Sequence, residues 1–260
     1  MRARVRFSKL GKVRFTSHRD LARVFERAMR KAMIEVAYSD GFTPRPKVSF
    51  GLALPTGAES VAEYLDMELV ADATPGELTG RLNAVLPRGF SVTMIERIER
   101  ADVSLQQDVI ACAWSIGLVG VTAAEAAAAA SRVLGAETFV LERSRKGEVR
   151  RDDVRPAIES LSVTTDSSVD SVSADSVSGE SVSGESVSGG VTMQAVLATR
   201  ARGLRPTELL MVCFPDRDPL DVGGRVLRTC QWIERDGARW ELLPLPDAAV
   251  LTPTTEVVGV

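Results

Sequence analysis

Residues 15–54 decide the fold of the first half of this chain, and they read FTSHRDLARVFERAMRKAMIEVAYSDGFTPRPKVSFGLAL. Ser17 followed three residues later by Asp20 is typical of a capping box, which satisfies free amides at the start of a helix. The pattern therefore predicts a helix that begins at His18. At 100° per residue, its apolar side gathers Leu21, Val24, Phe25, Ala28, Met29 and Ala32.

The opposite side of this helix gathers four arginines, Arg19, Arg23, Arg27 and Arg30. Guanidinium groups match phosphate oxygens and do not lose their charge, so this stripe is a candidate site for an anion. An ordinary solvated helix face has the same pattern, and both interpretations stay open here.

His18 is the single histidine of the chain and stands in the first helical turn. A histidine there can act as a general acid or base. A local hydrogen-bonding role is the alternative, because no second His or Cys lies nearby in the sequence to complete a catalytic or metal site.

The loop after the helix combines two cations with two aromatic rings: Tyr38, Phe42, Arg45 and Lys47. Pro44 and Pro46 fix their own φ angles and force the residues before them to be extended, so we expect a stiff loop. Exposed rings could stack on bases, which favours a nucleic-acid contact. A structural loop with its aromatic side chains packed beneath it is the other interpretation.

Charge is distributed unevenly along the 260 residues. Residues 1–50 carry 13 Lys/Arg and 4 Asp/Glu, a net charge of +9, although the whole chain has −3. The basic pole thus coincides with the predicted helix and loop. The composition is that of a soluble globular protein, and we expect a cytoplasmic protein because no apolar run approaches the length of a membrane span or a signal peptide.

The three cysteines, Cys112, Cys213 and Cys230, are widely separated. Their spacing argues against a disulfide framework and against a zinc or iron–sulfur site, so we expect buried thiols, no metal and no cofactor. No glycine-rich phosphate loop, dinucleotide fingerprint or nucleophile elbow occurs in the sequence.

The order of the predicted elements indicates an α+β fold. Strands at 2–7, 48–54, 65–69 and 90–98, with helices from 18 and from 75, give the order β-α-β-β-α-β of a ferredoxin-like module. In that topology the first strand lies antiparallel beside the third, so Arg2, Arg4 and Arg6 should oppose Asp66 and Glu68 on the outward face. This makes the two carboxylates arginine partners rather than metal ligands.

We predict two domains, a basic ferredoxin-like domain at 1–100 and a second α+β domain at 108–260. In the second, the sequence predicts strands at 109–118, 138–143, 191–199, 226–234 and 239–243, a helix at 122–134 and short helices from Arg155 and Arg205. This half is predicted to be a second ferredoxin-like module of similar make. The Ser/Val/Gly-rich repeats at about 162–190 predict a disordered insertion.

Several short motifs of the first hundred residues agree together with one family. They are residues 5–9 (VRFSK), 15–21 (FTSHRDL), 37–50 (AYSDGFTPRPKVSF), 55–60 (PTGAES) and 63–66 (EYLD). In order and spacing this set resembles the radical SAM-linked proteins, a bacterial family of unknown function. Members are fused to, or encoded beside, B12-binding-type radical SAM proteins. The family usually has leucine where Arg19 stands, and the Ser/Val-rich insertion is peculiar to this chain.

The resemblance implies a radical SAM protein as partner and establishes no reaction. Radical SAM enzymes hold an iron–sulfur cluster with three clustered cysteines, a spacing that Cys112, Cys213 and Cys230 lack. We therefore expect a non-catalytic accessory protein whose basic helix and Pro-rich loop bind RNA or an acidic partner surface. The alternative, by fold analogy with tandem ferredoxin-like RNA-processing proteins of the CRISPR type, is a metal-independent endoribonuclease that uses His18.

Overall fold

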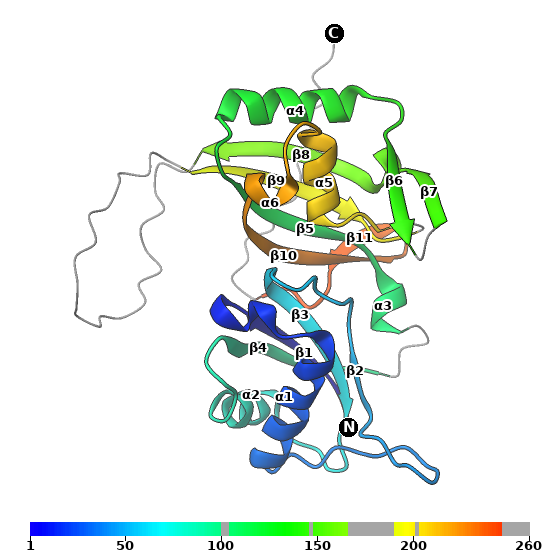
Figure 1. Cartoon of the computed structure of the whole chain (residues 1–260). Coiled ribbons are helices and arrows are strands. Elements are labelled where there is room, and N and C mark those ends of the chain that lie inside the picture. Colours follow the sequence, from blue (N-terminus) through cyan, green and yellow to red (C-terminus); the bar gives the residue numbers. More distant parts are fainter. Residues whose placement is uncertain (100–103, 146–147, 166–189, 201–202, 246–260) are drawn as a thin grey trace, which may run out of the picture.

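The computed structural model describes residues 1–99, 104–145, 148–165, 190–200 and 203–245. The first part of the chain follows the predicted order of strands and helices (Figure 1). Its elements are β1 (Arg2–Lys9), the 3-10 helix η1 (Gly11–Phe15), α1 (His18–Lys31), β2 (Val48–Phe50), β3 (Glu59–Glu68), α2 (Pro75–Asn83) and β4 (Phe90–Arg97). β1 lies antiparallel between β3 and β4, and β2 lies antiparallel beside β3.

The second part of the chain adds seven strands with their helices. They are α3 (Leu105–Asp108), β5 (Val109–Leu118), α4 (Ala123–Gly135), β6 (Val140–Arg145), β7 (Glu148–Asp153), η2 (Arg155–Ala157), β8 (Ile158–Thr165), β9 (Val191–Ala198), α5 (Pro206–Cys213), α6 (Pro219–Val222), β10 (Gly223–Arg235) and β11 (Ala238–Glu241). Neighbours in the order β10-β5-β9-β8 are antiparallel, and β6 pairs with β7 in a separate hairpin.

A short parallel contact joins the two parts into one sheet. Leu227 and Arg228 of β10 pair with Glu59 and Ser60 at the start of β3. In the described residues the sheet has nine strands along the path β4-β1-β3-β10-β5-β9-β8, with β2 and β11 beside β3 and β10. The fold is therefore a mixed α+β fold built on a large, mostly antiparallel sheet.

Each part of the sheet has its own apolar core. In the first, α1 and α2 cover the face that carries Ala3, Val5 and Phe7, and the rings of Phe7 and Phe25 lie 4.6 Å apart between their centroids. In the second, α4 and α5 cover β5, β8 and β9 around Trp114 and Met193. The alternation of apolar residues in β1 and β5 places these side chains on the covered face.

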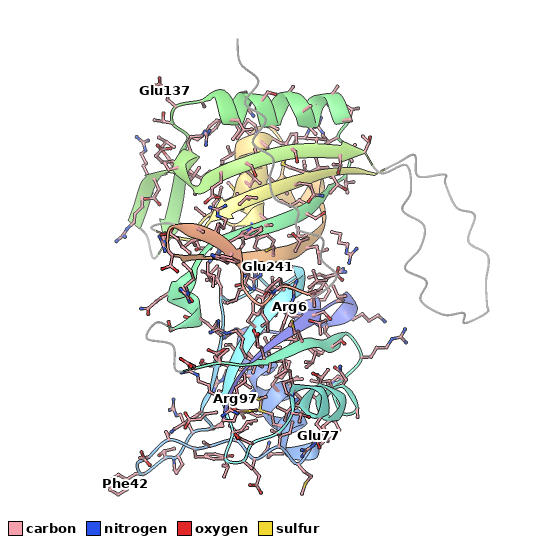
Figure 2. The ribbon with its side chains drawn as sticks, turned by 180° about the vertical axis from the view of Figure 1, so that it is seen from behind. Arg6, Phe42, Glu77, Arg97, Glu137 and Glu241 are labelled. Atoms are coloured by element: carbon pink, nitrogen blue, oxygen red, sulfur yellow. The ribbon has the colours of Figure 1, made fainter. Side chains whose placement is uncertain are left out.

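The expectation about the opposite face of β1 is half right. Arg2 and Arg4 do pair across the strands with Glu68 and Asp66, and Arg4 donates to both Asp66 oxygens at 2.8 and 3.0 Å. The face is nevertheless buried around Arg4 and Asp66 rather than solvated. At Arg6, further along β1, the segment around β11 provides cover, because Arg6 donates to Glu241 at 2.7 Å and to the carbonyl of Leu243 at 2.9 Å (Figure 2).

Several predicted boundaries are wrong. The 3-10 helix η1 at Gly11–Phe15 was not predicted, and the strand expected at 48–54 ends at Phe50. β6 overlaps the strand predicted at 138–143, but its hairpin partner β7 and the strand β8 were not predicted, and β8 extends to Thr165 inside the expected insertion. The remainder of that insertion, 166–189, lies outside the described residues.

Candidate functional site

The start of α1 is held by the expected residues. The Ser17 hydroxyl accepts the amide of Asp20 at 3.2 Å and donates to the Asp20 carboxylate at 2.8 Å. This hydroxyl is also the main reason that the pKa of Asp20 lies below its ordinary value. The predicted helix start at His18 is confirmed.

The two sides of α1 separate as predicted. Leu21, Phe25, Ala28 and Met29 are buried. The four arginines of the opposite side, Arg19, Arg23, Arg27 and Arg30, are exposed, and we call them the basic stripe. Arg23 donates to Asp20 at 3.1 Å, one turn back.

Two arginines of the basic stripe, Arg27 and Arg30, are free to bind an external anion. Within the described residues, no carboxylate forms an ion pair with Arg27 or Arg30. This contrasts with Arg4 and Arg6 on β1, which are buried and paired with Asp66 and Glu241. Ion pairs within the protein thus neutralise Arg4 and Arg6 of β1, whereas Arg27 and Arg30 of α1 face solvent.

His18 is exposed at the first position of α1, and its ring meets the edge of Phe50 at 5.7 Å between centroids. In the described part of the chain, no carboxylate, lysine or cysteine hydrogen-bonds to it. The structure therefore gives His18 an aromatic neighbour but no orienting partner of the kind that general acid–base catalysis uses.

The two sides of the loop 38–47 pair closely with each other. The amide of Ser39 donates to the carbonyl of Arg45 at 2.8 Å, the Ser39 hydroxyl accepts the amide of Arg45 at 3.0 Å, and Tyr38 bridges Pro46. Gly41 turns the chain with φ of +117°. The tip carries Phe42 into solvent, away from the body of the protein (Figure 2).

All four candidate side chains of this loop are exposed: Tyr38, Phe42, Arg45 and Lys47. Lys47 donates to Glu68 at 3.1 Å. The aromatic rings are not packed beneath the loop, which removes the structural interpretation for Phe42. Among the described residues, no hydrogen bond, ion pair or ring contact joins the loop to the basic stripe, so helix and loop are two separate surfaces.

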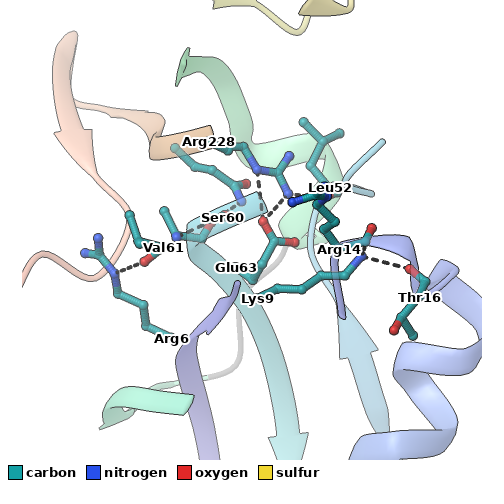
Figure 3. A network of polar contacts seen from close by, with 11 residues as sticks. Arg6, Lys9, Arg14, Thr16, Leu52, Ser60, Val61, Glu63 and Arg228 are labelled. Atoms are coloured by element: carbon teal, nitrogen blue, oxygen red, sulfur yellow. Dashed lines mark hydrogen bonds and ion pairs between the residues drawn. The ribbon is translucent and has the colours of Figure 1, made fainter. Parts of the chain in front are cut away.

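Sequence reasoning missed a buried polar centre where the two parts of the sheet meet (Figure 3). Arg228 of β10 is fully buried and donates through Nε at 3.0 Å and through Nη2 to one oxygen of Glu63. Its Nη2 also donates to the carbonyl of Leu52 at 2.8 Å. Lys9 at the end of β1 is buried beside them and donates to the carbonyls of Thr16 and Arg14 at 2.8 and 3.3 Å.

Burial is the main influence on the charge of Lys9 in this centre. Loss of hydration lowers the pKa of Lys9, and the nearby Glu63 opposes that shift. At the edge of the centre, Glu59 accepts the amide of Gly11 at 2.6 Å and pairs with Arg225. A partial signal exists in the sequence, because Lys9 follows Val5 and Phe7, and Glu63 precedes Leu65 and Met67, at the two-residue spacing of one strand face.

A cavity of about 290 Å³ adjoins Arg228, and we call it the junction cavity. Its walls come from both parts of the chain, among them Leu52, Pro55, Trp114, Leu197 and Leu204. The Arg228 guanidinium also lies over the ring of Trp114, 5.6 Å from its centroid. A second cavity of about 400 Å³ lies between α4 and residues 213–217, with Arg132 and Arg217 in its wall.

The three cysteines are free and buried, as expected. Burial raises the pKa of each thiol, and that of Cys213 reaches about 12. These thiols are therefore protonated at neutral pH and unsuited to act as nucleophiles. Within the described residues, no three His, Cys, Asp or Glu side chains cluster as a metal site would require.

Comparison with known families gives one result. The family described as "Uncharacterized protein conserved in bacteria (DUF2344)" matches residues 2–188. The chain belongs to this family. The DUF2344 match contains the basic stripe, the loop 38–47, Lys9 and Glu63, whereas Arg228 lies beyond it. No curated protein matches the chain.

The family description names no activity, so function rests on the geometry. None of the helices in the described part of this DUF2344 protein combines the length and the apolar character that crossing a membrane requires.

Proposed function

We propose that this DUF2344 protein is a non-catalytic accessory protein that binds RNA through the basic stripe of α1 and the loop 38–47. The observation that carries the proposal is the exposure of Arg27 and Arg30 without a carboxylate partner in the described residues. A rigid helix that presents guanidinium groups at one-turn spacing suits a chain of phosphates.

The loop supports the same proposal. Phe42 and Tyr38 offer exposed rings on which unpaired bases can stack, and the exposed Arg45 adds a positive charge to the same loop. The loop does not touch the stripe, so an RNA that uses both must extend across the first part of the sheet. This favours a flexible single-stranded RNA over a single phosphate ligand.

We further propose that both parts of the chain are ferredoxin-like modules. The first has the strand order β4-β1-β3-β2, and the second has the order β10-β5-β9-β8 with the hairpin β6–β7 inserted. In each order, the first strand of the module lies between its last and its third. In a module of this kind the helices pack on one face of the sheet, so the sheet holds α1 in a fixed position.

The partner in this proposal is a radical SAM protein, which the resemblance of the first hundred residues implies. In this arrangement the accessory protein presents an RNA and the partner modifies it. Co-purification of tagged protein with a radical SAM protein from its own cells is expected, and its absence would remove this part of the proposal.

The RNA contact is tested by fluorescence anisotropy with a labelled single-stranded RNA. The double variant Arg27→Gln/Arg30→Gln should bind at least about tenfold more weakly, because it loses two phosphate contacts. The matched control is Arg200→Gln/Arg217→Gln, which removes the same charge from exposed arginines of the second part and should bind normally. Equal weakening by both pairs would indicate a net-charge effect and contradict the assigned surface.

An acidic protein surface is the other anionic partner that the basic stripe fits. If Arg27→Gln/Arg30→Gln disrupts co-purification of the partner and leaves RNA affinity unchanged, the stripe binds protein and the RNA proposal fails.

The endoribonuclease alternative makes a different prediction. If His18 is the catalytic group, His18→Ala abolishes cleavage of some RNA and leaves its binding intact. The accessory proposal predicts no metal-independent cleavage that depends on His18.

A further inference from the structure

The junction cavity is lined in part by a buried cationic group that has an unpaired hydrogen-bond donor. Arg228 is fully buried, and its Nη1 has no hydrogen-bond partner among the described residues. Nε and Nη2 are engaged by Glu63 and the carbonyl of Leu52, as Figure 3 shows. The thiol of Cys112 interacts with the guanidinium, but a neutral thiol is a weak acceptor.

Cationic side chains outnumber carboxylates around Arg228. Arg228 and Lys9 are both buried, and Glu63 is the carboxylate that faces them both. The second nearby carboxylate, Glu59, is already engaged by Arg225 and lies close to Arg14. Four cationic side chains, two of them buried, therefore surround two buried carboxylates. A buried N–H of Arg228 without an acceptor is costly, and the surrounding positive charge favours an anion as that acceptor.

We propose that the junction cavity binds a small organic carboxylate with an apolar body, whose carboxylate accepts a hydrogen bond from Nη1 of Arg228. The apolar body contacts Leu197, Leu204 and the ring of Trp114. Arg205 lines the same cavity and is exposed, so it stands at the entrance and contributes to the attraction of the anion.

The lining determines the class of ligand. Most of the wall is apolar, and the volume of about 290 Å³ is near the lower end of small-molecule pockets. A phosphate needs donors on several sides of its oxygens, whereas the interior offers a single free guanidinium nitrogen, Nη1 of Arg228. A carboxylate attached to a hydrocarbon or aromatic group satisfies that donor and fills the apolar remainder.

The experiment uses the full chain with phenylacetate and its neutral analogue phenylacetamide as probes, followed by tryptophan fluorescence and thermal unfolding. Phenylacetate should bind about 10- to 100-fold more tightly than the amide, the range of one charge-assisted hydrogen bond. Arg228→Gln should abolish this preference. Because Arg228→Gln removes a partner of Glu63 and can fail to fold, a second variant is required.

Ala53→Phe serves as that variant. Ala53 lines the cavity and is exposed, so a larger side chain there fills the entrance without contact to Arg228. It should abolish phenylacetate binding while the unfolding temperature without ligand stays unchanged. The control Arg217→Gln, at the other cavity, should bind phenylacetate normally.

Three results would overturn the proposal. The first is the absence of binding by both phenylacetate and hexanoate up to about 10 mM, beyond the weakest useful affinities. The second is equal binding of the acid and the amide. The third is displacement of phenylacetate by inorganic phosphate at equal concentration, which would assign the cavity to a different class of anion.

Discussion

At the scale of single residues, the protein separates arginines that serve the fold from arginines that face outward. Arg4 and Arg228 are buried against Asp66 and Glu63, at distances that leave no room for solvent. Arg27 and Arg30 lie on the exposed side of α1. Local sequence predicted the exposed set because helical periodicity is a local property. It could not predict Arg228, whose partner lies 165 residues away along the chain.

The pair Arg228–Glu63 yields a stability prediction. Glu63→Ala leaves Arg228 buried without the carboxylate that it bonds, so we expect a loss of about 3–5 kcal/mol in the free energy of unfolding by urea. The matched control is Glu68→Ala, which breaks the exposed pair with Lys47 and should cost no more than about 1 kcal/mol. Similar losses in the two variants would show that the buried centre does not stabilise the junction.

Cys213 yields a prediction about pH. Burial raises the pKa of its thiol to about 12, whereas the thiol of the unfolded chain titrates near about 8.5. Above the unfolded value the unfolded chain binds fewer protons than the folded one, so stability falls as pH rises from about 8.5 toward 12. We expect this fall to be shallower in Cys213→Ala, as measured by urea unfolding across the alkaline range. Identical slopes in the two proteins would refute the assigned shift.

At the scale of elements, the sequence predicted best where one short pattern sets an element's ends. The strand predicted at 109–118 is β5, and the helix predicted from Thr122 is α4 with both bonds of its capping box. The predictions failed where distant contacts decide. β2 ends at Phe50 because the chain then turns so that the carbonyl of Leu52 meets Arg228 of β10. The strand β7, which pairs with β6, has weak apolar alternation and was missed for that reason.

The capping box of α4 gives a prediction for one element. Thr122 accepts the amide of Glu125 at 3.2 Å, and the Glu125 carboxylate accepts the amide of Thr122 at 2.8 Å. Thr122→Ala should therefore cost about 1 kcal/mol in the free energy of unfolding. Ser131→Ala changes an exposed residue within the same helix and should have no destabilising effect, since alanine is the better helix former. A harmless Thr122→Ala would mean that the box does not hold the helix start.

At the scale of the whole molecule, the chain concentrates its positive charge in the part that carries α1. Residues 1–50 have a net charge of +9, but the paired strand arginines contribute little to the outside field. The outward positive charge consists mainly of the basic stripe, Arg45 and Lys47 of the loop, and the exposed Lys12 and Lys31. This distribution, rather than the overall charge of −3, sets which partners approach the first part of the sheet.

The salt dependence of RNA binding tests the central claim most directly. Affinity for a labelled single-stranded RNA is measured between about 50 and 200 mM salt for the wild type and for Arg27→Gln/Arg30→Gln. The account predicts a steep negative slope of log affinity against log salt for the wild type, and a slope smaller by about 1.4 for the variant, about 0.7 for each lost phosphate contact. Equal slopes and equal affinities in the two proteins would contradict the claim that the basic stripe binds RNA.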